Sequence, residues 1–260
     1  MTSNFGFMRI QFFLTLFALS FFCEFRAENI QKNRLTDSIS TATMLSIKFF
    51  LFENKVKNLY QEIDATSYNL SYEVFRYAYI GYLTLRIEQR LNEKNLFSII
   101  DFTKKSNEKR FYTIDLQQKK IIYNTYVSHG KKSGDSVCDS FSDVFESHKS
   151  SLGFYITGNT YNGSNGFSLQ LYGDEKGYNS NMAKRGVVIH TADYVSEAYI
   201  AKNGRLGRSF GCPVLPENIY KQVIETIKNK TLIFAYYNDE KYLMTSKYLN
   251  VNKIIEFLYL

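Results

Sequence analysis

The order of apolar and polar residues divides the chain into a leader-like start, a helical part and a strand-rich part. Apolar residues 10–22 follow a start with one basic residue, Arg9, and precede Cys23 to Ala27. This run is shorter than the roughly 20 residues that cross a bilayer. The pattern predicts a secretory signal peptide over residues 1–27, with an uncleaved membrane anchor as the alternative.

Residues 28–95 have a helical pattern. Helices are expected over about 41–60 and after Ser71, which can act as a cap. Beyond Ser71, apolar residues recur near the 3.6-residue period from Val74 to Leu91. Nothing in this segment suggests chemistry, so we expect these helices to serve packing.

From residue 96 to the end, the pattern favours strands. Three expected strands, 97–102, 110–116 and 120–127, form a meander. Later strands are expected at 152–157, 167–172, 186–190 and 231–237, and Asn162-Gly163 and Asn165-Gly166 suit tight turns. The chain is therefore expected to have an α+β fold, with a mostly β domain over 96–260 behind the helical segment.

Composition narrows the class of protein. The 260 residues are 45% hydrophobic and only 22% charged, which argues against wholesale disorder. The formal net charge of +7 suggests an anionic partner, but Lys and Arg are scattered and no nucleic-acid-binding signature is present. Three cysteines are too few for a disulfide scaffold.

Metal and nucleotide sites find no support in the residue spacing. The sequence has neither HExxH nor paired CxxC, so we expect no metal and no cofactor. The loop from Gly204 to Ser209 lacks the Lys-Ser/Thr ending of a phosphate loop. A thiol enzyme is then the first catalytic interpretation to consider, with Cys212 as the candidate nucleophile.

The surroundings of Cys212 suggest how its thiol would be activated. It follows a loop with three glycines and precedes Pro213, Pro216 and an amphipathic helix expected over 217–228. Free N–H groups at a helix N-terminus can lower a thiol pKa from about 8.5. Gly211 would let a substrate carbonyl approach closely, and N–H groups near it would form an oxyanion hole.

A base must come from elsewhere in the chain. Residues 186–190 read as a buried strand that ends in His190, which would hold an imidazole on a rigid platform. Thr191 or a backbone carbonyl would then fix the other ring nitrogen. From the residues alone the pairing stays open, because a buried cysteine is commonly inert packing and a strand-end histidine a core residue.

Two runs, Gly186-Val-Val-Ile-His-Thr-Ala-Asp-Tyr-Val-Ser196 and Gly204-Arg-Leu-Gly-Arg-Ser-Phe-Gly-Cys-Pro213, resemble the YkuD-like murein L,D-transpeptidases. The resemblance covers about residues 70–237 and is closest to the branch with a Gly-Arg-Ser-x-Gly-Cys-Pro signature. It implies a β-sandwich or barrel-like catalytic domain with Cys212 as nucleophile and His190 as general base. Ser209 and Gly211 match the motif residues before the nucleophile.

The resemblance also implies a substrate and its contacts. Such enzymes cut the amide before D-alanine in a peptidoglycan stem peptide and pass the acyl group to an amine. Arg205 and Arg208 are candidate clamps for stem-peptide carboxylates, with loop tethers as the alternative. Tyr161 and His129 are candidates for the substrate cleft, with core or strand-end roles as the alternatives.

The leading interpretation is therefore an exported cysteine acyltransferase of the periplasm or cell envelope, an L,D-transpeptidase. Its expected partners are peptidoglycan stem peptides, with no nucleic acid and no stable membrane span after signal removal. An L,D-carboxypeptidase would differ only in using water as acceptor. A noncatalytic peptidoglycan-binding protein gains weight from Phe210 and Val214, which stand where the widespread motif has His and Asn. A zinc peptidase would need bound metal, and the oligomeric state stays open.

Overall fold

The computed structural model describes Arg26, Gln31 and residues 40–258, which fall in two compact units, Met1–Phe52 and Glu53–Leu260. Residues 40–52 of the first unit and 53–62 of the second are helical, which agrees with the helix expected over about 41–60. Apart from Arg26, the expected signal peptide lies outside the described residues. Among the residues that are described, no helix combines the length and apolarity needed to cross a membrane.

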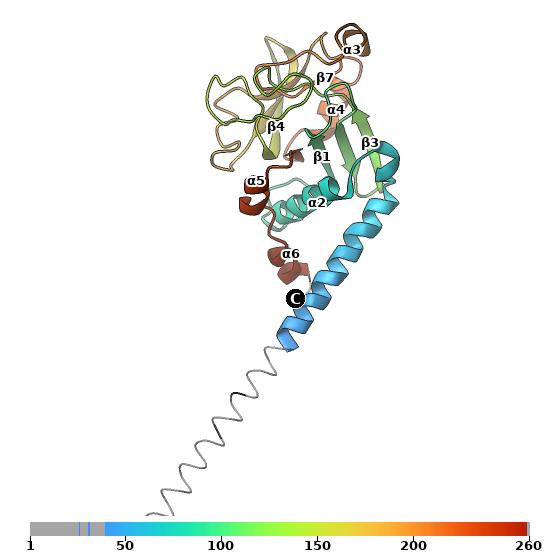
Figure 1. Ribbon diagram of the computed structural model, residues 1–260, viewed down its shortest axis with the longest axis vertical. Coiled ribbons are helices and arrows are strands. Elements are labelled where there is room, and N and C mark those ends of the chain that lie inside the picture. Colours follow the sequence, from blue (N-terminus) through green and yellow to red (C-terminus); the bar gives the residue numbers. More distant parts are fainter. Residues whose placement is uncertain (1–25, 27–30, 32–39, 259–260) are drawn as a thin grey trace, which may run out of the picture. The chain divides into compact units, whose positions relative to one another are not determined.

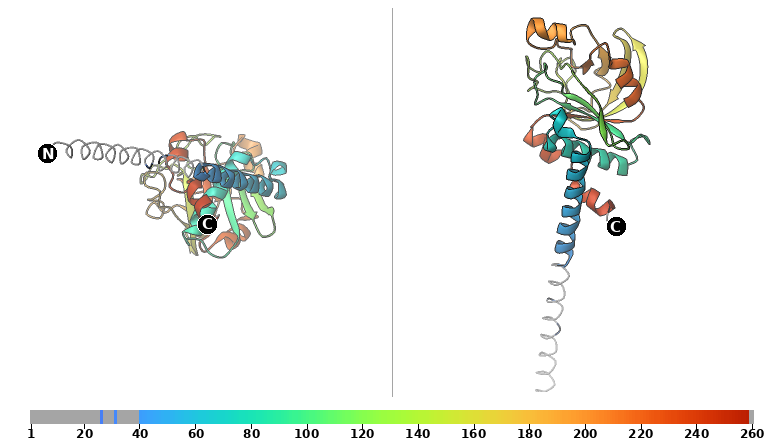
Figure 2. Two further views of the ribbon diagram at one scale, coloured as in Figure 1. Left: turned by 90° about the horizontal axis from the view of Figure 1, so that it is seen from below. Right: turned by 90° about the vertical axis from the view of Figure 1, so that its right-hand side faces the viewer.

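A mixed sheet of eight strands forms the body of the second unit (Figures 1 and 2). Its spatial order is β3-β2-β1-β8-β4-β5-β6-β7. The strands are β1 (Leu96–Asp101), β2 (Phe111–Asp115), β3 (Lys120–Thr125), β4 (Gly153–Gly163), β5 (Gly166–Tyr172), β6 (Val188–Thr191), β7 (Val214–Leu215) and β8 (Leu232–Tyr236). The antiparallel pairing of β1 with β2 and of β2 with β3 confirms the meander.

The two edges of the sheet meet just beyond β3. Ser128 forms an antiparallel bridge with Val214 of β7, and its N–H donates to the Val214 carbonyl at 2.9 Å. The sheet is therefore nearly closed, and the expected α+β, barrel-like fold is confirmed.

Helices cover both faces of β1. On one face, α2 (Tyr72–Ile87) packs against β1 and β8, and the rings of Tyr79 and Tyr82 lie against Phe97. On the other face, α4 (Tyr220–Ile227) shares the main core with Ile100. Because helices cover both faces, all six residues of β1 are buried.

Helix α2 begins where the sequence predicts it. The Ser71 hydroxyl accepts a hydrogen bond from the Val74 N–H at 3.3 Å, and Glu73 places a carboxylate in the first turn. Both features favour the helix start, the first by satisfying a free N–H and the second through the helix dipole. The 3-10 helix η1 (Ala65–Tyr68) precedes α2.

Several elements differ from the sequence expectation. The helices α3 (Glu197–Asn203), α5 (Glu240–Thr245) and α6 (Val251–Leu258) and the two-residue strand β7 were not anticipated. The β4–β5 hairpin turns at residues 164–165, followed by Gly166 at φ 74°. Gly163 remains paired in β4, so the turn expected at Asn162-Gly163 is wrong, because the hairpin needs only one tight turn.

A buried carboxylate fixes α5 to the sheet. Glu175 is 5% exposed and accepts hydrogen bonds from the Phe154 N–H at 2.8 Å and from the hydroxyls of Tyr242 at 3.0 Å and Ser246 at 2.5 Å. Burial raises the pKa of Glu175, and these donors act against that rise. The unit that contains the sheet thus includes the C-terminal helix α5 as well as the helical residues before residue 96.

Candidate active site

Cys212 follows a tight turn that requires glycine at position 211. Gly211 has φ 125°, and a Cβ there would lie 2.8 Å from the Lys149 carbonyl oxygen. The Ser209 hydroxyl donates to the Cys212 carbonyl at 2.6 Å and accepts from the Gly211 N–H at 3.0 Å. These are the contacts of a local turn, which Ser209 closes through its hydroxyl. They also engage the Gly211 N–H, one of the N–H groups in the region where an oxyanion hole is expected.

His190 and Cys212 lie on the same face of the β6–β7 pair. The two strands run parallel with His190 opposite Val214. Side chains alternate along a strand, and Ile189 points into the main core, so His190 points to the other side. On that side Cys212 packs against Val214 in a separate small cluster. The pairing of β6 with β7 thus places His190 on one side of this strand pair, the side where Cys212, two residues before β7, packs against Val214.

The tautomer of His190 is set by its own strand. Its Nδ1 lies 2.8 Å from the Thr191 carbonyl oxygen, which can only accept, so Nδ1 carries the hydrogen and Nε2 the lone pair. The side chain is 6% exposed, and burial lowers its pKa below the usual 6.5, an effect that the Thr191 contact opposes. At neutral pH the imidazole is therefore uncharged and able to accept a proton at Nε2.

The Cys212 thiol lies against the start of β6. Its Sγ is 3.5 Å from the Val188 N–H nitrogen and 3.9 Å from the Gly186 carbonyl oxygen. Burial raises the pKa of the thiol above 9.0, while the Val188 N–H and the charge of Arg185 lower it in part. With His190 uncharged as well, the resting pair is a neutral thiol and a neutral imidazole.

The expectation that a helix N-terminus lowers the pKa of Cys212 is wrong. The helix begins only at Tyr220, because Val214 and Leu215 first form β7 and a turn follows Pro216. The helix dipole acts mainly on the first turn, so its effect does not reach back to Cys212. The groups that favour a thiolate are instead the Val188 N–H and Arg185.

Arg185 is the residue of this site that sequence reasoning missed. Its Nη1 donates to the Ser142 carbonyl and the Ser151 hydroxyl, both at 2.7 Å. Its Nη2 donates to the Lys149 carbonyl at 2.7 Å and lies 3.3 Å from the place of a Cβ on Gly211. The guanidinium therefore holds the loop 142–151 against the nucleophile turn. No sequence motif could have identified Arg185, because its hydrogen-bond partners lie 34 to 43 residues away in the chain.

Replacing Arg185 with glutamine is expected to slow the reaction of Cys212 with iodoacetamide at pH 7 to 8, because removal of the cation raises the pKa of the thiol. It should also lower the free energy of unfolding by about 1–3 kcal/mol, since two loop carbonyls lose a charged donor. The pH profile of alkylation and thermal unfolding measure the two effects. Lys184→Gln, which removes the adjacent exposed cation, is the control. An Arg185→Gln profile that matches this control would refute the electrostatic role.

Tyr161 lies on β4, next to residues that contact the Cys212 sulfur. Together with Tyr172 it lines a small cleft of about 170 Å³ that also includes Gly186 and Val188, the two residues in contact with the Cys212 sulfur. Tyr161 and Tyr172 are 42% and 45% exposed, so neither is a core residue. The cleft is suited to a peptide segment next to the thiol.

Arg205 and Arg208 are both engaged within their own surroundings. The Arg205 Nε and the Arg208 Nη1 lie 2.9 and 3.2 Å from Asp135 Oδ1. Arg205 also donates to the Leu206 carbonyl and Arg208 to the Gly134 carbonyl. These contacts are those of loop tethers, the alternative to a carboxylate clamp.

His129 has no exposed surface, so the geometry favours its structural alternative over a place in the cleft. Its Nδ1 lies 2.7 Å from the Nη2 of Arg110, which is itself fully buried and donates to the Val127 carbonyl. Burial, together with the charge of Arg110, lowers the pKa of His129 to about 3. The uncharged ring helps to hold a buried arginine beneath the site.

A comparison with protein families identifies the family of this chain. The family profile described as L,D-transpeptidase catalytic domain matches residues 66–236, more than half of the chain. The chain belongs to the L,D-transpeptidase catalytic domain family. No curated protein sequence matches it.

Solved structures similar to this L,D-transpeptidase domain include an L,D-transpeptidase from Mycobacterium smegmatis, with 10% identity over 55% of this chain and 59% of that chain and a TM-score of 0.36. The helical cell shape determining protein Pgp2 (K307A mutant) from Campylobacter jejuni is 12% identical. The match covers 62% of this chain and 57% of that chain, with a TM-score of 0.38. These matches span less than two thirds of either of those chains. A third structure, an L,D-transpeptidase from Stackebrandtia nassauensis, is 16% identical. The match covers 60% of this chain and 67% of that chain, with a TM-score of 0.33.

Phe210 marks the main departure of this L,D-transpeptidase domain from the widespread motif. Its ring is 65% exposed and lies 4.5 Å from the His148 ring and 4.2 Å from the Lys131 ammonium. Phe210 therefore forms an aromatic surface beside the nucleophile turn, where the motif would place an imidazole.

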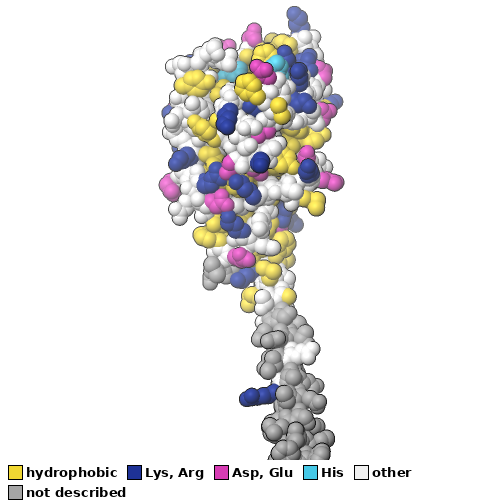
Figure 3. Space-filling model, turned by 90° about the vertical axis from the view of Figure 1, so that its left-hand side faces the viewer, with side chains coloured by type: hydrophobic (Ala, Val, Ile, Leu, Met, Phe, Trp, Pro, Cys, Tyr) yellow, Lys and Arg dark blue, Asp and Glu magenta, His cyan; other side chains and the backbone are white. Residues whose placement is uncertain are grey.

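Basic side chains are spread over the surface, as the scattered Lys and Arg of the sequence predict. Figure 3 shows Lys and Arg side chains interspersed with Asp and Glu over the face it presents. Within the described part of the L,D-transpeptidase chain, no group of three or more His, Cys, Asp or Glu side chains is placed to hold a metal ion.

Proposed function

We propose that this chain is an exported L,D-transpeptidase that acts on peptidoglycan stem peptides through a thioester on Cys212. The observation that carries the proposal is the position of His190 on β6 and of Cys212 two residues before β7, the strand that pairs with β6, with Nε2 of the imidazole available as a base. The signal-peptide pattern of residues 1–27 supports export to the periplasm or cell envelope.

In the first half-reaction, Cys212 Sγ attacks the carbonyl of the amide before D-alanine while His190 Nε2 takes the thiol proton. The oxyanion that forms accepts a hydrogen bond from the Cys212 N–H, since the Gly211 N–H is bound to Ser209. The C–N bond then breaks, and the proton on Nε2 passes to the departing D-alanine amine. An acyl thioester remains on the enzyme.

In the second half-reaction, an amine of another stem peptide attacks the thioester carbonyl. The C–S bond breaks, the amine proton passes to Nε2, and from there it returns to the sulfur. Water in place of the amine would give an L,D-carboxypeptidase with the same residues. Because the resting pair is neutral, the proton moves during the attack rather than before it.

Incubation of the protein with a diaminopimelate-containing tetrapeptide tests this proposal. We expect a tripeptide-acyl adduct on Cys212, loss of D-alanine and a cross-linked dimer, all followed by mass spectrometry. Tripeptide without dimer would assign a carboxypeptidase. Neither adduct nor product, together with retained binding to peptidoglycan, would assign a noncatalytic binding protein.

A further inference from the structure

A tyrosine lies on the same side of the β6–β7 pair as the candidate nucleophile. Tyr194 comes three residues after the end of β6. Like Cys212, it packs against the small cluster formed by Val195, Leu206 and Val214. The two side chains therefore share one packing environment, apart from the main core.

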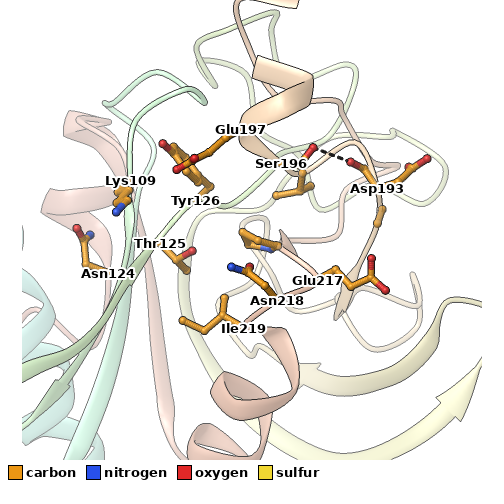
Figure 4. Close-up of a pocket in the computed structure, with 13 residues that line it drawn as sticks. Lys109, Asn124, Thr125, Tyr126, Asp193, Ser196, Glu197, Glu217, Asn218 and Ile219 are labelled. Atoms are coloured by element: carbon orange, nitrogen blue, oxygen red, sulfur yellow. Dashed lines mark hydrogen bonds between the residues drawn. The ribbon is translucent and has the colours of Figure 1, made fainter. Parts of the chain in front are cut away.

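The backbone around Tyr194 forms a tight turn. The Val195 N–H donates to the Ala192 carbonyl at 3.1 Å. The Ser196 hydroxyl donates to the Asp193 carbonyl at 3.0 Å, as Figure 4 shows. Four residues of this turn, but not Tyr194, line a cleft of about 490 Å³ next to the end of β3: Ala192, Asp193, Val195 and Ser196. The Tyr194 side chain is thus turned away from that cleft.

Gly207 makes room for the Tyr194 ring. The Gly207 N–H donates to the Tyr194 carbonyl at 2.9 Å. A Cβ on Gly207 would lie 2.5 Å from the Tyr194 Cγ and closer still to its Cβ, so only glycine allows this approach. The ring is therefore fixed against the loop that leads to Cys212.

The Tyr194 hydroxyl is accessible to a substrate. None of the hydrogen bonds of the described residues involves it, and the atom is not fully buried, so it can be reached from solvent. Burial raises the pKa of Tyr194 to about 12, and the negative charges of the Cys212 thiolate and of Asp193 add to the rise. The hydroxyl is therefore protonated at neutral pH, and it is near enough to the sulfur to respond to its charge.

The proposed reaction leaves its oxyanion short of donors. The Gly211 N–H is bound to the Ser209 hydroxyl, which leaves the Cys212 N–H as the donor from the nucleophile turn. Enzymes of acyl transfer commonly hold the oxyanion with more than one preorganised donor, and a tyrosine hydroxyl can be one of them. A further donor must then come from a side chain next to the thiol.

We infer that the Tyr194 hydroxyl is the second oxyanion donor of this site. The inference rests on the proposed function. As Cys212 Sγ bonds to the amide carbon, the carbonyl π electrons move to oxygen, which accepts hydrogen bonds from the Cys212 N–H and the Tyr194 O–H. The hydroxyl keeps its proton. When the electron pair returns to form the carbonyl, the C–N bond breaks and the amine takes its proton from His190 Nε2.

Tyr194→Phe in the full chain tests this role, because it keeps the ring over Gly207 and removes only the hydroxyl. We expect kcat for D-alanine release from the tetrapeptide to fall about 10²–10³-fold, the usual cost of one oxyanion donor, with KM unchanged. The melting temperature should stay the same, since the hydroxyl has no hydrogen bond within the described fold. An unchanged kcat would overturn the inference.

Tyr126→Phe is the matched control. Tyr126 packs against the same small cluster, but its hydroxyl lies beside the Glu197 carboxylate in the cleft of Figure 4. Loss of this hydroxyl should leave kcat unchanged. If both variants lost activity to the same extent, the packing of the cluster would be responsible, and Tyr194 would not be an oxyanion donor.

Alkylation by iodoacetamide separates an effect on the oxyanion from an effect on the thiol. This reagent loses iodide from a saturated carbon, so no oxyanion forms. The Tyr194→Phe protein should therefore be alkylated at Cys212 at nearly the rate of the unmodified protein. A loss of alkylation as large as the loss of kcat would show that Tyr194 acts on the ionisation of the thiol and would refute the inference.

A second acyl donor, p-nitrophenyl acetate, separates the inference from the proposed function. Its ester forms a tetrahedral oxyanion with a thiolate but carries no peptidoglycan group. If only this ester acylates Cys212 and Tyr194→Phe slows the reaction, the proposed function fails and the oxyanion donor stands. If the tetrapeptide adduct forms equally fast on Tyr194→Phe, the inference fails and the proposed function stands. A Cys212 that neither probe acylates would contradict both.

Discussion

Replacing Cys212 with alanine is expected to abolish the acyl adduct and to reduce D-alanine release by about 10³-fold or more, because the thioester needs this sulfur. Mass spectrometry of the intact protein after incubation with tetrapeptide measures the adduct, and chromatography of the peptides measures the release. The fold should be retained, since Cys212 is only partly buried and packs in a small cluster apart from the main core.

Cys138→Ala is the matched control for this experiment. Cys138 is a free thiol in the main core, and burial raises its pKa to about 12, so it has neither the access nor the ionisation of a nucleophile. The Cys138→Ala protein should form the adduct as the unmodified chain does. An adduct that persists without Cys212 and disappears without Cys138 would reverse the assignment.

Replacing His190 with glutamine is expected to slow acylation by about 10²–10⁴-fold, the usual contribution of a general base. The pH dependence should change as well. Burial lowers the pKa of His190 below the usual 6.5. The unmodified protein should therefore keep its base at neutral pH, and its acylation rate should fall only when the pH drops far enough to protonate the imidazole.

The variant must instead rely on spontaneous ionisation of Cys212. Because burial raises the pKa of this thiol, the rate of the His190→Gln protein should rise about tenfold per pH unit until the thiol ionises. Stopped-time assays between pH 5 and 10 measure both profiles. A variant whose rate is flat near neutral pH would mean that the thiol is already ionised without the histidine.

The sequence predicted the parts of this site that depend on local pattern. Ser71 marks the start of α2, alternation identifies the meander, and the motif around Cys212 together with the strand expected to end at His190 selects the two residues that we propose as the catalytic pair. Each of these signals is contained in a short stretch of the chain. Alternation along β6 puts His190 on the side away from the main core, where Val214 of β7 and the neighbouring Cys212 also lie.

What could not be predicted depends on contacts across the chain. Arg185 stands before β6 with no periodic or motif signal, and its function follows only from the loop 142–151 that folds back over it. Strand β7 has two residues and exists because β6 pairs with it. The same short strand separates Cys212 from α4, which is why the pKa argument built on chain proximity failed.

The hydrogen bonds of Glu175 bear on where the catalytic domain ends. The family profile stops at residue 236, yet Tyr242 and Ser246 beyond it supply two of the donors to this carboxylate. A chain shortened to the profile would keep Cys212 and His190 but would leave the buried carboxylate of Glu175 without these two donors. We therefore expect a chain that ends at residue 236 to be less stable than one that continues through Ser246, because it loses two hydrogen bonds to a buried carboxylate.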